Sequence, residues 1–340
     1  RRRRKKKKGD QAEMTTEDVA ATATASASAA APPIHAGQLS NQSAEVLERA
    51  RRSARKREAY VESGAGASFA FEALWDHILA SQCTHPKPEE TSREAAGRAA
   101  EEEGPPEGSP EGECTVCLFE QRLFGLPQLP EMIFPENRLI IRWKDKPTSF
   151  LSFCALDALL RVDTERLPNV QVAPSSAWQE ARANFPEFRQ FSRPFDWTFT
   201  TDYAGTAHGL RGVETTEKVD MERLKRQEPI LFYAQVPLYE DELADHGSSQ
   251  LSVRIRVMPS CFFVLQRCYL RVDRVMVRVC DTRVYSARGG DGSILVEWTM
   301  RESPWAALSH LEREVILDSN QLWLHLPVIK QKNTKFLPDS

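Results

Sequence analysis

The stretch 251-LSVRIRV-257 has the sharpest periodic pattern in the chain and decides the fold. Its apolar residues alternate with serine and arginine, which is the period of a β-strand with one buried face. The next run, Cys261–Val272, is almost continuously apolar and predicts a strand that is covered on both faces. Alternation returns at Val275–Tyr285 and, after a glycine-rich turn, at Ile294–Met300. Residues 249–300 therefore predict an antiparallel β-meander.

Segments on both sides of the meander predict further strands and short helices. Alternation predicts strands at residues 139–143, 194–203 and 230–239. Helical signals predict short helices at 152–161, from a capping Ser176, at 220–226, and from Ser303-Pro304. Inside the meander, Asp273-Arg274 is short enough for a hairpin, although Arg274 stands where a glycine would favour positive φ.

Composition divides the chain into parts. With 41% hydrophobic and 27% charged residues among 340, it is typical of a protein whose core occupies only part of its length. Low-complexity and charged stretches cannot bury enough apolar surface to offset the entropy of ordering. We therefore expect a disordered N-terminal region at 1–62 and a single domain at 63–330. We also expect a disordered insert at about 84–113 and a frayed tail at 331–340.

The charge distribution favours some classes of partner over others. The net charge is −3, yet residues 1–8 (RRRRKKKK) carry +8, so the remainder carries −11. A globular part of that charge argues against nucleic-acid binding. The basic run itself is interpreted as a solvated tail, with a nuclear-localisation or phosphate-binding patch as the alternative.

Targeting signals and cysteines bear on the cellular compartment. No run approaches the roughly 18 apolar residues of a membrane helix, and the first residues lack the apolar stretch of a secretory signal. Seven cysteines, an odd number scattered through strand-like segments, favour reduced thiols over a disulfide framework. We expect the protein in the cytoplasm or the nucleus.

Two cysteine motifs have spacings that occur in enzymes or metal sites. Cys261 and Arg267 have the spacing of a cysteine-dependent phosphatase loop, but the residues between them are bulky where that loop needs small ones. We interpret Cys261 as a buried strand residue. Cys114 and Cys117 have zinc-ligand spacing without a second pair, so two cysteines flanking a strand are the simpler interpretation.

The segment Glu240–His246 concentrates four carboxylates and one imidazole. Such a cluster between strands indicates a solvated turn first, an electrostatic surface for a basic partner second, and a metal site third. The third interpretation gives the alternative function, a metal-dependent hydrolase that uses Glu240–His246. No phosphate loop, nucleophile elbow or zinc-protease helix is present in the sequence. The chemistry therefore favours a non-catalytic binding protein without cofactor or metal.

Several collinear blocks resemble one known family. They are Leu129–Met132 (LPEM), Phe195–Thr206 (FDWTFTTDYAGT), Glu240–Gly247, Leu251–Phe263 (LSVRIRVMPSCFF), Cys280–Arg283 (CDTR) and Arg301–Ser303 (RES). Together they resemble the TOR signalling pathway regulator-like family, the Tip-forty-one-like (TIPRL) proteins. The resemblance covers roughly residues 69–83 and 115–330.

The resemblance implies a fold and a function. The fold would be α+β, with layered antiparallel β-sheets and short flanking helices. The function would be that of a non-enzymatic regulator in TOR-linked signalling, which binds and restrains the catalytic subunits of type 2A, type 4 and type 6 serine/threonine protein phosphatases. The alpha-four-type phosphatase-associated protein is a further implied partner.

The resemblance also implies which residues bind the phosphatase. The positions are Asp157, Val219, Val279 and Asp281, and we expect three of them at ends or turns of elements, where a rigid sheet presents side chains to a partner. For Asp281 an alternative is that it caps its own turn through Thr282 and Arg283.

Overall fold

The computed structural model describes residues 51–52, 54–64, 66, 68–79, 126, 129–162, 170–172, 191–193 and 198–339. Residues 1–50, the insert at 84–113, the Cys114–Cys117 pair and the predicted helix after Ser176 lie outside these ranges.

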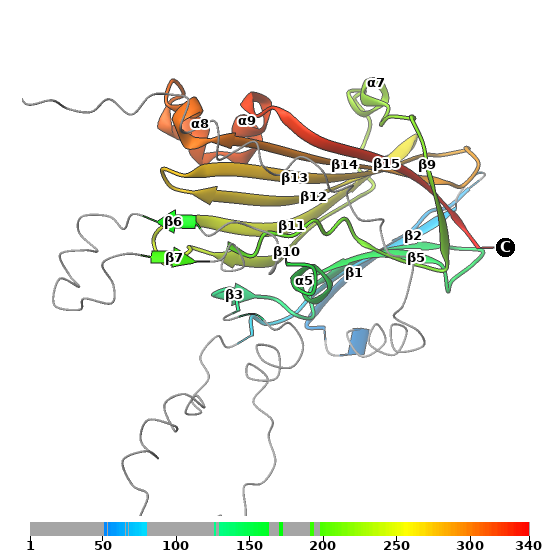
Figure 1. Ribbon diagram of the computed structural model, residues 1–340. Helices are drawn as coiled ribbons and strands as arrows, with labels where there is room; N and C mark the ends of the chain where they lie inside the picture. The colour runs from blue at the N-terminus through cyan, green and yellow to red at the C-terminus, as the bar shows by residue number, and fades with distance from the viewer. Residues whose placement is uncertain are drawn as a thin grey trace, which may run out of the picture. The chain divides into compact units, whose positions relative to one another are not determined.

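An eight-stranded antiparallel sheet has the predicted meander at its centre. Its strand order is β3-β10-β11-β12-β13-β14-β15-β9 (Figure 1). In that order the strands are Met132–Ile133, Phe232–Asp241, Gly247–Val257, Cys261–Val272, Met276–Ala287, Ile294–Pro304, Val328–Pro338 and Leu210–Glu214. The four meander strands predicted from the sequence are confirmed as β11 to β14.

The hairpin between β12 and β13 is confirmed together with its unfavourable residue. The N–H of Val275 donates to the carbonyl of Val272 at 3.0 Å, and Arg274 has a φ of 64°. A left-handed conformation at a residue other than glycine costs about 1–2 kcal/mol. The long paired register from Val272–Met276 to Cys261–Ala287 outweighs that strain.

A five-stranded antiparallel sheet packs against one face of the larger sheet. Its order is β1-β2-β4-β5-β8, with bounds Lys56–Val61, Phe69–Trp75, Arg138–Trp143, Phe150–Cys154 and Thr206–His208. The ring of Phe262 in β12 meets the rings of Phe69 and Phe71 in β2 edge-on, at centroid distances of 5.1 and 5.0 Å. These contacts place the main core between the two sheets. Two short strands, β6 (Val170–Val172) and β7 (Phe191–Arg193), pair with each other.

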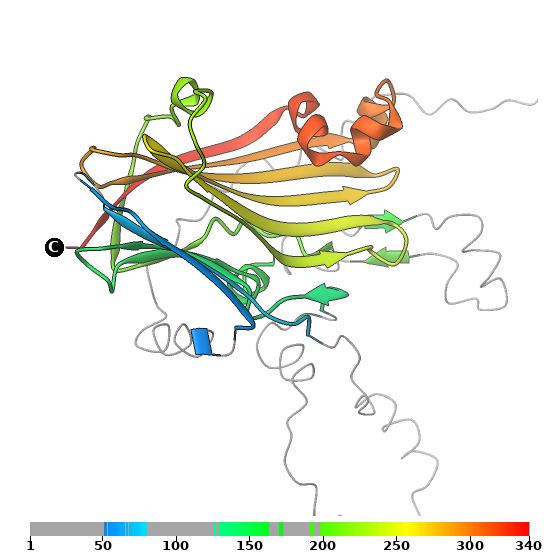
Figure 2. The same cartoon turned by 180° about the vertical axis from the view of Figure 1, so that it is seen from behind.

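Short helices lie on the opposite face of the eight-stranded sheet, which we call the outer face. Figures 1 and 2 show α7 at one end of this face and α8 and α9 at the other. The elements are α7 (Met221–Leu224), η4 (Trp305–Leu308), α8 (Arg313–Leu317), α9 (Ser319–Leu322) and η5 (Trp323–His325). A further helix, α5 (Ala155–Leu159), follows β5. The layered antiparallel α+β architecture is therefore confirmed, as are the short helices predicted at 152–161 and 220–226.

Two predicted elements have different structures. In the described part of 194–203, Phe199 has a φ of 54° and both Thr198 and Thr200 are buried, so this segment is a turn and not an alternating strand. The helix predicted from Ser303-Pro304 begins later, because both residues belong to β14 and η4 starts at Trp305. Backbone pairing of Ser303 with Val277 explains the delay.

Both ends of the expected domain extend further than the composition suggested. Lys56–Val61, inside the region predicted to be disordered, forms β1 and pairs along its whole length with β2. The tail at 331–340 was expected to fray, but β15 pairs with β14 on one side and with β9 on the other. We propose that the single domain begins before β1 and includes β15. No helix among the described residues is long and apolar enough to cross a membrane.

Replacement of Gly247 by alanine is expected to destabilise the fold at the start of β11. A Cβ at this position would lie 1.8 Å from the carbonyl oxygen of Arg271, a backbone atom in the paired strand β12. We expect Gly247→Ala to lower the free energy of unfolding by about 3 kcal/mol or more. Ser248→Ala, at the next residue, is the control. Equal urea midpoints for the two variants would contradict the close approach.

Candidate protein-interaction site

The structure places three of the four implied phosphatase-binding residues at the outer face. Val279 and Asp281 lie in the middle of β13, and Val219 directly precedes the Asp220 N-cap of α7. Asp157 lies instead in α5, next to the five-stranded sheet. The expectation that three of these residues sit at ends or turns is therefore wrong, because Val279 and Asp281 are inside a strand. The same position excludes the alternative of a turn cap for Asp281.

Asp281 forms a buried ion pair with Arg267 on the neighbouring strand. The two residues are directly paired in the register of β12 and β13. Arg267 Nε and Nη2 donate to the two carboxylate oxygens of Asp281, each at 2.7 Å. Asp281 has no exposed surface and Arg267 is 7% exposed. A carboxylate in such a place is retained only with a well-aligned cation, because its desolvation is otherwise uncompensated.

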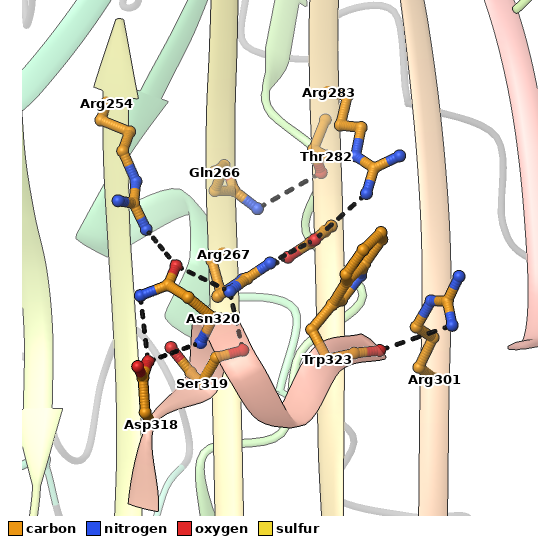
Figure 3. Close-up of polar contacts among 11 residues, drawn as sticks. Arg254, Gln266, Arg267, Thr282, Arg283, Arg301, Asp318, Ser319, Asn320 and Trp323 are labelled. Atoms are coloured by element: carbon orange, nitrogen blue, oxygen red, sulfur yellow. Dashed lines mark hydrogen bonds and ion pairs between the residues drawn. The ribbon is translucent and has the colours of Figure 1, made fainter. Parts of the chain in front are cut away.

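Arg267 also holds the short helix α9 against the sheet. Its Nη1 donates to the carbonyl of Ser319 at 2.9 Å and to Oδ1 of Asn320 at 3.1 Å. Arg254 in β11 donates to the same Asn320 oxygen at 3.2 Å. Figure 3 shows these arginines converging on Asn320, beside Asp318. Asp318 caps α9 by accepting from the N–H of Asn320 at 2.8 Å.

Trp323, the first residue of η5, lies between two guanidinium groups. The centroid of its ring is 4.7 Å from Arg283 and 4.4 Å from Arg301. Arg301 Nη1 donates to the carbonyl of Leu326 at 2.6 Å. Burial lowers the pKa of Arg301, and the neighbouring charge of Arg283 lowers it further. Contact with the two guanidinium groups fixes the orientation of Trp323 against the sheet.

Apolar clusters surround the two valines. Val279 packs with Tyr269 and Val277 of the sheet and with Leu308, Ile316, Leu322 and Leu326 of the helical segment. Val219 packs at the other end of the face with Met258, Cys261, Tyr285 and Leu295. Val279 has no exposed surface and Val219 is 6% exposed. Both valines therefore support the helices beside them.

Asp157 belongs to a separate, half-buried polar group. Its Oδ2 accepts a short hydrogen bond from the hydroxyl of Thr206, and the hydroxyl of Tyr203 bonds the same Thr206. Nearby, burial and the charge of Asp157 raise the pKa of the Cys154 thiol to about 12. These hydrogen bonds link α5 to β8. The structure therefore does not place Asp157 in one site with Asp281.

The acidic segment Glu240–His246 contains the last two residues of β10 and the turn to β11, as its first interpretation predicted, although Asp241 is buried and not solvated. Leu243, Ala244 and Asp245 all have φ values between 52° and 65°. Asp241 is 4% exposed, and its two oxygens accept from the N–H groups of Leu243 at 2.6 Å and Glu131 at 2.9 Å. Burial raises its pKa to about 6, with the charges of Glu131 and Glu242 adding to the effect.

A polar cavity of about 400 Å³ adjoins this turn, with Arg271 and Asp273 in its wall. Among the residues that the structure describes, no group of three or more histidine, cysteine, aspartate or glutamate side chains is arranged to hold a metal ion. The carboxylate oxygens of Asp241 are already bonded to backbone N–H groups. The geometry therefore gives no support to the metal-dependent hydrolase.

Cys261 and Arg267 do not form a phosphatase loop. They lie six residues apart in the extended strand β12, about 20 Å from one another by strand geometry. Burial raises the pKa of the Cys261 thiol. This confirms the interpretation of Cys261 as a strand residue.

The residues that sequence reasoning missed are Arg267, Asn320 and Trp323. A signal was present for Arg267, since a cation in the middle of the mostly apolar run of β12 implies a buried counter-ion. Asn320 lies 53 residues after Arg267 and Trp323 lies 40 residues after Arg283, and only the fold brings each pair together.

Comparisons with known proteins give one consistent result. The TIP41-like family profile matches residues 132–309. A TIP41-like protein of Caenorhabditis elegans is 41% identical over 288 residues, which cover 84% of this chain and 92% of the relative. A human TIP41-like protein is 41% identical over 207 residues, 60% of this chain and 75% of the relative. A protein of Saccharomyces cerevisiae named type 2A phosphatase activator TIP41 is 33% identical over 237 residues, 62% of this chain and 65% of the relative.

Replacement of Asp281 by leucine is expected to destabilise the fold, because it leaves Arg267 buried without its counter-ion. We expect Asp281→Leu to lower the free energy of unfolding by about 3–5 kcal/mol. The double variant Asp281→Leu/Arg267→Met removes both charges and is expected to recover most of that loss. Urea unfolding of both variants is the measurement. A double variant less stable than Asp281→Leu would contradict the account of the pair.

Asp241 is expected to give the stability a local pH dependence. Its pKa in the fold, about 6, lies above the ordinary value of 3.8. The folded chain therefore binds this proton more tightly than the unfolded chain between about pH 4 and pH 6. The contribution of Asp241 is thus most favourable at low pH and is lost as the pH rises through about 6. Relative to Asp241→Asn, the wild type should lose about 2 kcal/mol across this window. Parallel pH profiles of unfolding free energy for the wild type and Asp241→Asn would contradict a raised pKa of Asp241 in the fold.

Proposed function

The chain belongs to the TIP41-like family, and on that premise we propose that it binds catalytic subunits of type 2A-class serine/threonine protein phosphatases and regulates them without catalysing a reaction itself. Two fungal relatives support the proposal by name, since both the Schizosaccharomyces pombe and the Saccharomyces cerevisiae proteins are called type 2A phosphatase activators. The observation that supports the proposal for this chain is that Val219, Val279 and Asp281 all lie on one face of the eight-stranded sheet, Val219 at one end of it and the other two beneath α9 and η5.

The outer face has the physical character of a protein-binding surface. Exposed apolar side chains lie at both ends of it, with Met221 48% and Ile230 54% exposed near α7, and Leu324 69% exposed in η5. Half-buried Arg254 and Arg256 lie between these ends, on β11. Apolar groups beside arginines are typical of the centres of protein interfaces. A partner surface with acidic groups would complement this face.

The proposal extends to partners and to the sense of regulation. Type 4 and type 6 catalytic subunits and the alpha-four-type protein are further partners that we propose, in TOR-linked signalling in the cytoplasm or nucleus. The resemblance implied inhibition, whereas the two fungal relatives carry the word activator. We therefore propose regulation by binding. A phosphatase assay with and without the purified chain determines the sign.

A binding measurement with the purified type 2A catalytic subunit tests the proposal. Arg256→Glu reverses a charge on the outer face, and we expect it to weaken binding roughly tenfold because it faces acidic groups on the partner. Arg52→Glu reverses an exposed charge beside the five-stranded sheet and is the matched control. A wild-type chain that retains no phosphatase would contradict the function. Equal affinities for the two variants would exclude Arg256 from the interface.

A further inference from the structure

Two of the residues implied in phosphatase binding are inaccessible to a partner. Val279 and Asp281 have no exposed surface. Val279 packs beneath the segment from α8 to η5, and Asp281 is bonded to Arg267, which in turn bonds α9. A residue in this position can affect binding only through the groups that it holds. The question is therefore which surface group depends on Asp281.

A direct series of contacts leads from Asp281 to α9. Both carboxylate oxygens bond Arg267, whose remaining donor Nη1 bonds the carbonyl of Ser319 and the side chain of Asn320. Without Asp281, the guanidinium of Arg267 would be free to turn away from that carbonyl, and α9 would lose its main polar contact with the sheet.

The helices of this segment cannot hold their own conformation. The α8 helix has five residues and α9 has four, far below the roughly 12–15 residues at which an isolated helix becomes stable in water. Their position depends on the apolar cluster around Val279, on the stacking of Trp323 between Arg283 and Arg301, and on the bonds from Arg267.

The surface of the same segment exposes two leucines among polar and charged side chains, with arginines of the sheet beside it. Leu317, at the end of α8, is 46% exposed and Leu324 in η5 is 69% exposed. Within the described part of the chain, Arg254 and Arg301 bond uncharged oxygens and form no ion pair. A partner that presents carboxylates beside apolar side chains would complement both features.

We propose that Asp281 is a positioning residue, which acts through Arg267 to hold α9 and η5 against the sheet, and that Leu317 and Leu324 of the held segment contact the phosphatase catalytic subunit. This inference rests on the function proposed above. It assigns to Asp281 an indirect role and moves the contact to residues 317–324.

Amide hydrogen exchange on the full chain tests the positioning step without any partner. Asp281→Asn keeps the shape of the side chain and removes its charge, and it should raise exchange in residues 318–326 at least tenfold. Glu62→Gln is the matched control, because Glu62 is another buried carboxylate that bonds backbone N–H groups and an arginine, at a distant edge of the five-stranded sheet. Faster exchange throughout the sheet in Asp281→Asn, without a local excess at 318–326, would overturn the positioning role.

Asn320→Ala separates positioning from stability. Asn320 is an exposed residue, so its loss removes bonds to Arg267 and Arg254 without burying a charge. We expect faster exchange at 318–326 and at least fivefold weaker binding of the type 2A catalytic subunit, with a thermal midpoint close to that of the wild type. Unchanged binding by Asn320→Ala would contradict the coupling of α9 to recognition.

Surface variants test the contact itself. Leu324→Asp and Leu317→Asp should each weaken binding of the catalytic subunit at least tenfold and leave the thermal midpoint unchanged. Val61→Asp is the matched control, since Val61 is 57% exposed on β1 of the other sheet. Wild-type affinity in both leucine variants would overturn the assigned contact while the proposed function stands. A wild-type chain that binds no catalytic subunit would overturn the contact together with the function, and the exchange data would still decide the positioning role.

Discussion

The buried ion pair between Arg267 and Asp281 is the constraint on which the outer face depends. Burial of a guanidinium and a carboxylate costs a large desolvation free energy. Only two well-aligned hydrogen bonds between them offset that cost. Their alignment fixes the register of β12 against β13. The remaining donor of Arg267, Nη1, then bonds the carbonyl of Ser319 and so determines where α9 lies. The need to pair Asp281 with Arg267 thus links the centre of the sheet to α9 at the surface.

Two regions of the eight-stranded sheet use their charges differently. On the outer face, Arg267 is paired with Asp281, whereas Arg254 and Arg301 bond uncharged oxygens. Carboxylates are dense at the turn between β10 and β11. The most buried carboxylate at this turn, Asp241, accepts hydrogen bonds from two backbone N–H groups. Its oxygens are therefore already bonded, and among the described residues the carboxylates here do not form a group that could hold a metal ion. The outer face, by contrast, combines cations with exposed leucines, and this combination favours recognition of another protein.

Sequence patterns predicted the strands well and the site poorly. Periodicity found β11, β13 and β14 because one face of each strand is buried. The nearly continuous apolar run marked β12, in which every residue is buried or half-buried. Periodicity failed at Phe199, where a positive φ breaks an aromatic alternation, and at β1, whose charged edge strand has the composition of a disordered segment. The resemblance placed Asp281 in the right strand but gave it an exposed role. Its burial follows from the arginine opposite, which only the register reveals.

The most direct test of the account is amide hydrogen exchange of the full chain with and without the purified type 2A catalytic subunit. The account predicts that the partner slows exchange in α7 and in residues 313–326 and leaves the turn between β10 and β11 unchanged. Protection confined to that acidic turn, or to the five-stranded sheet around Asp157, would contradict the assignment of the outer face as the binding surface.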